Sequence, residues 1–486
     1  MSKWTLAKRW VGFGALTAVC SGGPLQVAPD GRTFVTSEGE AFFWLGDTAW
    51  ELFHRLDREE AAYYLGRRAE QGFNVIQAVL LAEADGLRSP NRYGAVPLHD
   101  MDPRRPNEAY FEHVDFIVQE AARRGLHVAM LPTWGDKVPS DRGGTGPVVF
   151  DVENAADYGR FLGRRYRDAP VIWMLGGDRP ADSEPVREIW RAMARGVREG
   201  SGGAQLLTYH PAGEETSAEW FPDDTWLDFH VYQSGHAKRF HPVERYTQPL
   251  ARLKPRKPYL DAEPPYEDIP LRFWDYLDWS GPKLVPSGVL DERGFIVRPG
   301  YFTLGFFDDY DVRVHAYWNL LEGGAGFTYG HNAVWQMHRA GQRAAIPCLQ
   351  DWEEALERPG AQQMRHVRTL FERRSFIRLE PDRSIAAGEN ADGPRRVRAA
   401  VDREGEFAVV YLAEARTVEL AMGKVRGAKV SATWFDPRTG EVARVEGVAN
   451  SGTRAFTPPS VGERVDWVLV IDAMDNALPA LSATGE

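Results

Sequence analysis

The stretch Val171-Ile-Trp-Met-Leu-Gly-Gly-Asp178 is an apolar run that ends in two glycines and an acid. The shorter stretch Pro258-Tyr-Leu-Asp-Ala-Glu263 repeats this pattern and also ends in acids. Short apolar runs of this kind are typical of strands buried on both faces of a parallel sheet. We therefore interpret each as a strand whose last residues emerge into a loop. Two carboxyl groups at the exits of parallel strands can face each other across one pocket.

Six further segments have the same strand-like character, at residues 42–46, 74–81, 127–131, 205–209, 227–232 and 326–329. Helical patterns lie between the strands, at residues 57–72, 108–124, 154–167, 185–198 and 311–321. Eight strand–helix units in about 300 residues predict an α/β fold of the (β/α)8 TIM-barrel type. The alternative, an open doubly wound sheet, lacks its G-x-G-x-x-G fingerprint after the first strand.

The pattern changes after Pro381, where helical periodicity gives way to short strand-like runs separated by turns such as Asp436-Pro-Arg-Thr-Gly440. These runs predict a small antiparallel β-sandwich. Residues 349–374 form a predicted helical bridge into it. The predicted organisation is an N-terminal segment at 1–24, a barrel domain at 25–375 and a C-terminal accessory domain at 376–486, in keeping with a length of 486 residues.

The composition excludes several classes of function. A formal net charge of -11 argues against a nucleic acid or an anionic membrane as the partner, because either requires a basic surface. The chain has two cysteines, Cys20 and Cys348, and therefore no disulfide framework or cysteine-rich metal site. It has no H-E-x-x-H motif, P-loop or G-x-S-x-G elbow. We accordingly expect neither a metal nor a cofactor, and an oligosaccharide or polysaccharide as the partner.

The N-terminus has two interpretations. Lys3, Lys8 and Arg9 precede an apolar run at residues 10–20, which resembles a short secretory signal. In that case the protein is secreted or periplasmic. Otherwise the segment is an extension of a cytoplasmic protein. No other apolar run approaches the length needed to span a membrane. The sequence leaves the oligomeric state open.

On the barrel interpretation, residues that follow the strands converge on one mouth, where barrel enzymes build their sites. The mouth should combine carboxylates for proton transfer with polar and aromatic groups that bind sugar. Asp178 and Glu263 are the predicted catalytic pair. The predicted substrate-binding residues are Asp47, Trp50, Glu83, Trp134, His210, His230, Tyr232, Gln233 and Tyr329.

Each assignment has a structural alternative. Asp178 can instead pair with Arg179 or cap a helix, and the carboxylate of Asp261 competes with Glu263 for the role at its strand end. Asp47 can be a helix N-cap in its Gly-Asp-Thr turn. His230 and Tyr232 alternate with an intervening valine, so both point the same way, either into the barrel or out of it.

Several long motifs resemble the apiosidase-like glycoside hydrolases of family 140: residues 43–50 (FWLGDTAW), 71–77 (QGFNVIQ), 107–111 (NEAYF), 131–136 (LPTWGD) and 173–179 (WMLGGDR). The tail, with Trp434-Phe-Asp-Pro-Arg-Thr-Gly440, resembles the so-called collagen-binding domain that usually follows them. Together these features cover roughly residues 25 to 475.

The resemblance implies a (β/α)8 barrel followed by a β-sandwich, and retaining exo-hydrolysis of apiosyl residues from pectic side chains. It implies an acid/base role for Asp178 and a nucleophile role for Glu263. One alternative is a glycosidase of other furanose or hexose specificity, such as an arabinofuranosidase. Another is a non-catalytic carbohydrate-binding protein with a degenerate barrel, against which the two intact acids count.

Overall fold

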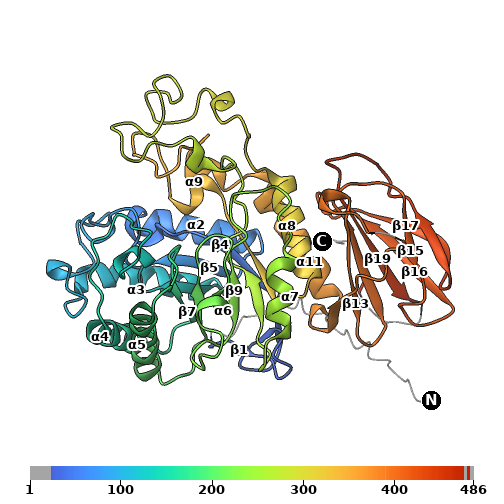
Figure 1. The fold of residues 1–486 in the computed structure, drawn as a ribbon, viewed down its shortest axis with the longest axis horizontal. Coiled ribbons are helices and arrows are strands. Elements are labelled where there is room, and N and C mark those ends of the chain that lie inside the picture. The colour runs from blue at the N-terminus through green and yellow to red at the C-terminus, as the bar shows by residue number, and fades with distance from the viewer. Residues whose placement is uncertain (1–22, 389, 475–478, 482–486) are drawn as a thin grey trace, which may run out of the picture.

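In the computed structural model, which describes residues 23–388, 390–474 and 479–481, eight parallel strands form a barrel with helices around it (Figure 1). The strands are β4 (Trp44–Thr48), β5 (Val75–Val79), β6 (His127–Leu131), β7 (Val171–Gly176), β8 (Leu207–His210), β9 (His230–Tyr232), β10 (Tyr259–Asp261) and β11 (Gly326–Tyr329). Their order in the sheet is β8-β7-β6-β5-β4-β11-β10-β9. The predicted eight-stranded parallel barrel is therefore confirmed.

Hydrogen bonds join the two end strands of this sheet and complete the ring. The Asp228 amide donates to the Leu207 carbonyl at 2.8 Å, and the Thr208 hydroxyl donates to the Phe229 carbonyl at 2.6 Å. A barrel closed in this way brings the carboxyl ends of all eight strands to one mouth.

Five helices that cover the barrel begin and end close to their predicted bounds: α2 (Arg58–Glu70), α3 (Glu108–Arg123), α4 (Val152–Arg165), α5 (Glu184–Ser201) and α8 (Asp309–Leu321). The helix α11 (Pro359–Arg373) lies within the predicted bridge at 349–374, and α7 (Glu244–Arg252) was not predicted. Shorter helices lie in the connections: α1 (Leu52–Arg55), α6 (Ser217–Trp220), α9 (Asn332–Trp335) and α10 (Trp352–Ala355). The predicted start of α2 is a capping box, in which Asp57 and Glu60 each accept the other's backbone amide.

A small antiparallel sheet closes the end of the barrel opposite the mouth. It consists of β1 (Gln26–Val27), β2 (Phe34–Val35) and β3 (Ala41–Phe42), which the sequence pattern did not reveal because the strands are only two residues long. Phe34 lies under the barrel, with its ring edge-on to Phe229 at 5.1 Å and 5.8 Å from Trp44. This contact seals the bottom of the core with apolar surface.

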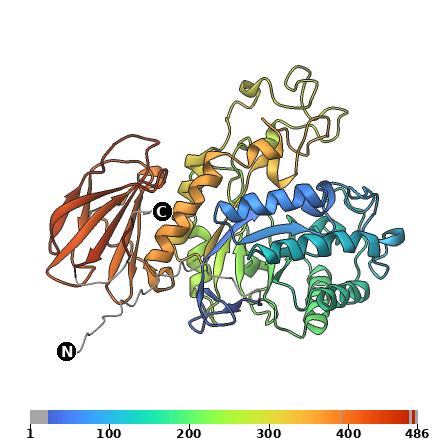
Figure 2. The same ribbon diagram turned by 180° about the vertical axis from the view of Figure 1, so that it is seen from behind.

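The predicted β-sandwich follows the barrel. A six-stranded antiparallel sheet has the order β12 (Leu379–Pro381), β13 (Val397–Asp402), β14 (Phe407–Leu412), β19 (Trp467–Ala473), β16 (Lys429–Phe435) and β17 (Val442–Ala449). A second sheet pairs β15 (Val418–Ala421) with β18 (Thr453–Phe456). Figure 2 shows the sandwich packed on one side of the barrel, next to α8 and α11.

A buried ion pair joins the two parts of the chain. Arg313 of α8 reaches Asp466, just before β19, with N–O distances of 3.0 and 2.9 Å, and both side chains are almost fully buried. Tyr411 donates a third bond to the same carboxylate at 3.0 Å. Because a lone charge in this interface would be costly, the pairing favours one fixed docking of the sandwich.

Most of the predicted N-terminal segment, residues 1–24, lies outside the described residues, so its interpretation as a signal stays a prediction. Within the part of the chain that the structure describes, no helix is both long and apolar enough to cross a membrane.

Candidate active site

Asp178 lies two residues beyond β7 in a tightly folded turn at the barrel mouth. Gly176, Gly177 and Asp178 all have positive φ angles, of 91°, 124° and 52°. A side chain on Gly177 would place its Cβ 2.8 Å from the Trp134 ring. The glycines therefore let the turn pass close to its neighbours, and Asp178 occupies a left-handed conformation that a non-glycine residue adopts at some cost.

Glu263 lies two residues beyond β10, across the mouth, and two histidines contact its carboxylate. His210 Nε2 lies 3.2 Å from Oε2, and His236 Nε2 lies 3.3 Å from Oε1. The side chain of Glu263 is only 6% exposed. The Gly235 amide donates a hydrogen bond to the Glu263 carbonyl at 3.0 Å, which links the loop that carries His236 to the loop that carries Glu263.

The protonation of His210 follows from its two contacts. Its Nδ1 lies 3.0 Å from the Pro211 carbonyl, which can only accept, so Nδ1 carries a hydrogen. The other nitrogen faces the carboxylate of Glu263. Burial lowers the pKa of His210, but Glu263 and Asp178 outweigh it and raise that pKa above the usual value. We therefore interpret His210 as an imidazolium that pairs with an ionised Glu263.

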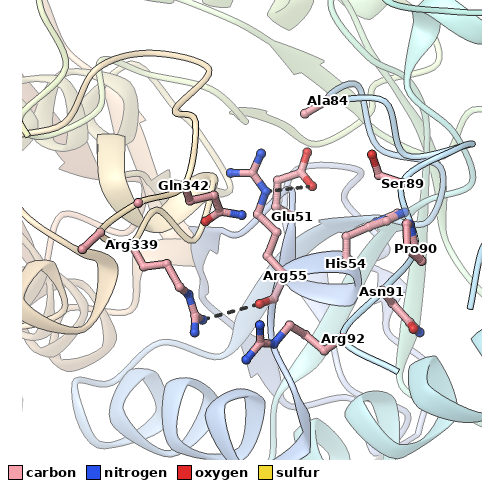
Figure 3. Close-up of a pocket in the computed structure, with 12 residues that line it drawn as sticks. Glu51, His54, Arg55, Ala84, Ser89, Pro90, Asn91, Arg92, Arg339 and Gln342 are labelled. Atoms are coloured by element: carbon pink, nitrogen blue, oxygen red, sulfur yellow. Dashed lines mark hydrogen bonds and ion pairs between the residues drawn. The ribbon is translucent and has the colours of Figure 1, made fainter. Parts of the chain in front are cut away.

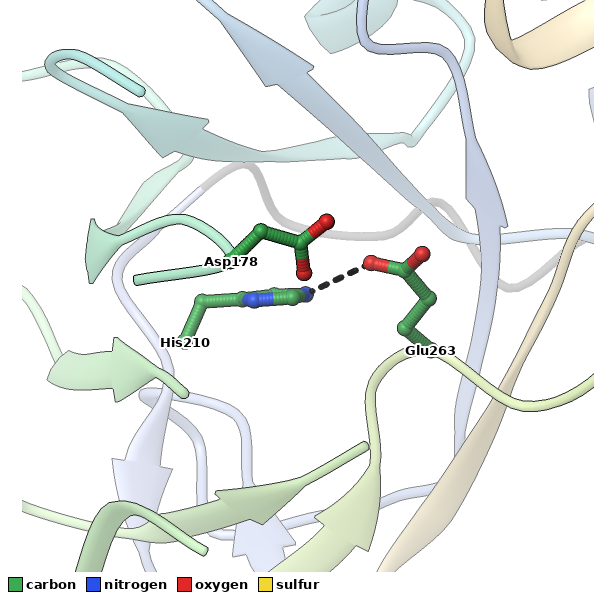
Figure 4. A group of neighbouring side chains, drawn as sticks. All are labelled: Asp178, His210 and Glu263. Atoms are coloured by element: carbon green, nitrogen blue, oxygen red, sulfur yellow. Dashed lines mark ion pairs between the residues drawn. The ribbon is translucent and has the colours of Figure 1, made fainter. Parts of the chain in front are cut away.

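Figure 4 shows the three side chains directed toward one another, with Asp178 above the tip of the His210 ring and Glu263 opposite. One nitrogen of His210 and one carboxyl oxygen from each acid lie within 4.8 Å of one another. Within the described residues, the buried Asp178 Oδ1 has no hydrogen-bond partner, as is typical of a site that binds a polar ligand.

The surroundings drive the two acids to opposite protonation states. Burial, together with the nearby negative charge of Glu263, raises the pKa of Asp178 to about 7. Burial acts in the same direction on Glu263, but the hydrogen bonds and positive charge of His210 and His236 outweigh it and lower the pKa to about 2. Near neutral pH the site thus holds one carboxylate and one carboxyl that can carry a proton, as a pair that shares acid and base roles requires.

The structural alternatives for these acids do not describe the geometry found. Arg179 pairs with Glu83 at 2.8 Å, and its nearest bond to Asp178 goes to the backbone carbonyl. Asp178 is no helix cap, because α5 begins at Glu184 with Ser183 as its N-cap. Asp261 accepts hydrogen bonds from Ser234 on the outer side of β10, where the amide of Asn319 also lies.

Trp50 and Trp134 lie beside His210 at the mouth. The ring of Trp50 is edge-on to the His210 ring at 5.5 Å and lies 5.2 Å from Trp134. The indole N–H of Trp134 is buried without a hydrogen-bond partner among the described residues. Glu83, which pairs with Arg179, and Gln233, which follows β9, also lie where the strands end, as the sequence predicts.

Four predicted binding residues point away from the mouth, which corrects the expectation for them. Asp47 accepts bonds from Tyr64 at 2.5 Å and Arg68 at 2.7 Å, both on α2. The other three also contact the helix layer or its loops: His230 contacts Ser217, Tyr232 bonds to Asn319, and Tyr329 bonds to Glu267. Successive side chains of a strand alternate between faces, and these four fall on the outer face.

Three residues at the mouth were missed by the sequence analysis. Gln77 of β5 points into the barrel, where it donates to the Ala262 carbonyl at 2.9 Å. His236 contacts Glu263, and its ring lies 4.7 Å from that of Tyr266. A glutamine inside an apolar strand was a readable signal for Gln77. His236 and Tyr266 lie in loops whose direction the sequence does not reveal.

The long loop after β10 adds aromatic surface next to Glu263. Phe273 lies 5.9 Å from His236 and packs against Trp274 and Trp279. Those two tryptophans are 41% and 53% exposed, which is unusual for side chains of this size. Exposed rings beside a polar site provide flat surfaces for the apolar faces of sugars.

Two family models match almost the whole chain. The family model described as "Apiosidase-like, catalytic domain" matches residues 28–378, and the model "Putative collagen-binding domain of a collagenase" matches residues 380–472. A search of curated proteins finds no match.

Two solved structures are similar over almost the whole chain. One, titled "Glycoside hydrolase", is 32% identical, covers 94% of this chain and 98% of its own, and has a TM-score of 0.78. The other, a glycoside hydrolase family 5 from Bacteroides vulgatus ATCC 8482, is 30% identical, covers 96% of both chains and has a TM-score of 0.80. A further Bacteroides vulgatus structure, 17% identical with a TM-score of 0.63, shares the fold.

Proposed function

Since the chain belongs to the apiosidase-like family of catalytic domains and is a glycoside hydrolase, we propose that it is a retaining, exo-acting enzyme. It removes terminal apiosyl residues from pectic glycans. One observation carries the proposal: Asp178 and Glu263 face each other with carboxyl oxygens within 4.8 Å, and their pKa values lie on opposite sides of the ordinary range.

The separation of the acids supports retention. Retaining glycosidases hold their two carboxyl groups ~5–5.5 Å apart, whereas inverting enzymes need ~6.5–9.5 Å to admit a water molecule. One oxygen of Asp178 and one of Glu263 lie within 4.8 Å of each other, which is closer to the first range than to the second and supports the proposal of retention.

In the first step, the Glu263 carboxylate attacks the anomeric carbon while the proton of Asp178 passes to the leaving oxygen. The glycosidic bond breaks, and a glycosyl ester forms on Glu263. In the second step, Asp178, now a carboxylate, removes a proton from water as that water attacks the anomeric carbon. The ester bond breaks, Glu263 returns to its ionised form and Asp178 regains its proton.

The neighbouring groups support these roles. His210 and His236 contact the two oxygens of Glu263 and stabilise its negative charge between turnovers. Trp50 and Trp134 are almost fully buried and pack beside the His210 ring, next to the reacting centre. The burial of Glu263 suits a pocket that accepts the end of a glycan, and therefore supports exo action. The apiosyl specificity rests on the family description.

The test uses aryl glycosides with a range of sugars and follows the anomer first released by NMR. We expect release of apiose with retained configuration. Glu263→Gln should lower kcat by roughly 10^4-fold or more. Asp178→Asn should lower it by roughly 10^2–10^4-fold on sugar leaving groups. On a nitrophenyl leaving group, which needs no proton, kcat/KM should fall much less, because it reports the first step alone, whereas kcat still falls with the loss of the base for the second step.

Asp261→Asn is the matched control, because it removes an acid from the same strand end that does not face the gap. It should keep most of the activity. First release of the inverted anomer, or near wild-type turnover by Glu263→Gln, would overturn the assignment of roles. Turnover of another sugar in place of apiose would contradict the proposed apiosyl specificity but would leave the assignment of catalytic roles unchanged.

A further inference from the structure

Arg179 directly follows the proposed acid Asp178, and its side chain joins three loops at the barrel mouth. Its Nη1 donates to the Asp178 carbonyl at 2.9 Å. Its Nη2 donates to Glu83 Oε1 at 2.8 Å, and its Nε donates to the Gly143 carbonyl at 2.6 Å. These acceptors belong to the connections after β7, β5 and β6. The side chain is only 14% exposed, so all three guanidinium nitrogens are used within the protein, next to the catalytic acid.

The chain leaves space for this side chain with two glycines. A Cβ on Gly135 would lie 2.9 Å from both Cβ and Cγ of Arg179, and a Cβ on Gly144 would lie 2.9 Å from its Nη2. The carbonyl of Arg179 accepts a further hydrogen bond from the Tyr209 hydroxyl at 2.9 Å. A larger residue at either glycine would displace the arginine, so the surrounding loops are shaped to hold it.

The carboxyl of Asp178 depends on its backbone for its position. Two histidines contact the carboxylate of Glu263, whereas the buried Oδ1 of Asp178 has no hydrogen-bond partner within the described residues. The φ angle of Asp178 is 52°, a left-handed conformation that a non-glycine residue keeps only where its surroundings hold it. The bond from Arg179 to the Asp178 carbonyl fixes the peptide group that links these two residues.

Glu83, the partner of Arg179, belongs to a loop that is itself held in place. The buried His54 lies behind this loop, with its Nε2 3.0 Å from the Gly86 carbonyl. Figure 3 shows this side of the loop, where Ala84 and His54 line a pocket. Arg179 is therefore bonded to a fixed part of the mouth.

We propose that Arg179 is a positioning residue, which holds the carboxyl of Asp178 at the leaving oxygen by fastening the peptide group between them to the loops that carry Glu83 and Gly143. The inference rests on the proposed function and deepens it, because it concerns the acid of that reaction. Arginine suits this role, because its rigid planar fork presents donors in several directions at once. A displacement of about 1 Å can cost a catalytic group about 100-fold in rate, so the fastening has a measurable effect.

Arg179 and Glu83 also act on Asp178 through their charges. Burial and Glu263 raise the pKa of Asp178 most. Glu83 raises that pKa further, whereas His210 and Arg179 lower it. Arg179→Gln should therefore raise the pKa of Asp178, and Glu83→Gln should lower it. A general loosening of the mouth would not shift the pKa in opposite directions.

The test compares two glycosides of the sugar that the wild-type protein releases. One has a nitrophenyl leaving group, which needs no proton, and the other has a sugar leaving group, which does. We expect Arg179→Gln and Arg179→Lys to lower kcat/KM by roughly 10–100-fold on the sugar leaving group and by less than about threefold on the nitrophenyl group. Infrared titration should show the pKa of Asp178 raised in Arg179→Gln, lowered in Glu83→Gln and unchanged in Arg179→Lys, which keeps the charge but not the fork.

Arg187→Gln is the matched control. Arg187 also supports the loop after β7, because it donates to the Ala181 carbonyl at 2.9 Å, three residues beyond Asp178. Its loss should affect both leaving groups alike. Circular dichroism checks the fold of every variant. If Arg179→Gln does not fold, Arg179→Lys and Glu83→Gln still give the leaving-group comparison and the pKa shift.

Equal losses on the two leaving groups in the Arg179 variants, or no loss on either, would overturn the inference. It would also be overturned by an Asp178 pKa that is the same in wild type, Arg179→Gln and Glu83→Gln. A wild-type protein that cleaves neither glycoside would instead refute the proposed function. A leaving-group difference that Asp178→Asn shows and the Arg179 variants lack would refute this inference alone.

Discussion

Asp178 and Glu263 face each other across the barrel mouth with carboxyl oxygens within 4.8 Å, and the negative charge of Glu263 is one cause of the raised pKa of Asp178. The two acids are thus coupled, because the charge that makes Glu263 a nucleophile also keeps the proton on Asp178. His210 and His236 complete the arrangement by stabilising the ionised form of Glu263.

The value of kcat/KM should decrease at alkaline pH. Asp178 acts in its protonated form, and burial and Glu263 raise its pKa to about 7, so the active fraction decreases as the pH rises through 7. Glu263 acts in its ionised form with a pKa of about 2, so it sets no limit at mildly acidic pH. We expect kcat/KM to be level from about pH 4 to pH 6 and to fall tenfold per unit above 7. A profile that rises between pH 6 and pH 8 would contradict this assignment.

Glu263→Gln should lower the pKa of Asp178. The substitution removes the neighbouring charge but leaves the burial, so the pKa should fall below 7 and stay above 3.8. Infrared titration of carboxyl groups measures it. Burial also raises the pKa of Asp261 to about 7, so the Asp178 signal is identified by its loss in Asp178→Asn. An unchanged Asp178 pKa would mean that the two acids are not coupled.

His236 should act as a positioning residue for Glu263. His236→Phe keeps a ring against Tyr266 but removes the donor to the carboxylate. We expect the pKa of Glu263 to rise and kcat/KM to fall by roughly 10–100-fold, as for the loss of a bond to a charged group. His236→Gln, which can replace the Nε2 donor, should recover most of the loss. Equal defects in both variants, with no shift of the acidic limb, would indicate a packing role instead.

Asp47 should contribute to stability and not to substrate binding. Its carboxylate and Arg68 form a fully buried ion pair at 2.7 Å between β4 and α2. Asp47→Asn leaves the arginine charge without its partner, which costs about 3–5 kcal/mol in a buried pair. We expect urea unfolding to show that loss, while KM of the folded fraction stays unchanged. A stable variant with a raised KM would place Asp47 at the substrate after all.

Chelation should leave the activity intact. Asp178, His210 and Glu263 offer three ligand atoms within 4.8 Å, a spacing that also suits a cation. The proposed mechanism nevertheless needs no cation, because the two carboxyl groups supply the nucleophile, the acid and the base, and His210 already pairs with Glu263. We expect full turnover after dialysis against EDTA. Activity that disappears with EDTA and returns with a divalent cation would contradict this expectation and show that the cluster binds a metal.

The sequence by itself determined the barrel, because short apolar runs and helical periodicity are local patterns that the structure reproduces, with β6 and β11 at their predicted bounds. It also located Asp178 and Glu263, since a residue that follows a parallel strand must emerge at the mouth whatever the strand's orientation. Trp50 and Trp134 also follow strands and lie at the mouth for the same reason, whereas His210 is the last residue of β8 and only the structure shows which way it points.

Only the tertiary structure decided which strand residues face the core of the barrel and which face the helices. Both faces of a parallel barrel are buried, so polarity does not alternate along its strands and the sequence gives no sign of direction. For this reason Asp47, His230, Tyr232 and Tyr329 seemed to belong to the mouth. His236 was hidden for a related reason, because its contact with Glu263 depends on how two loops fold toward one another. The same proximity sets the pKa values of the two acids, which no single segment of the chain contains.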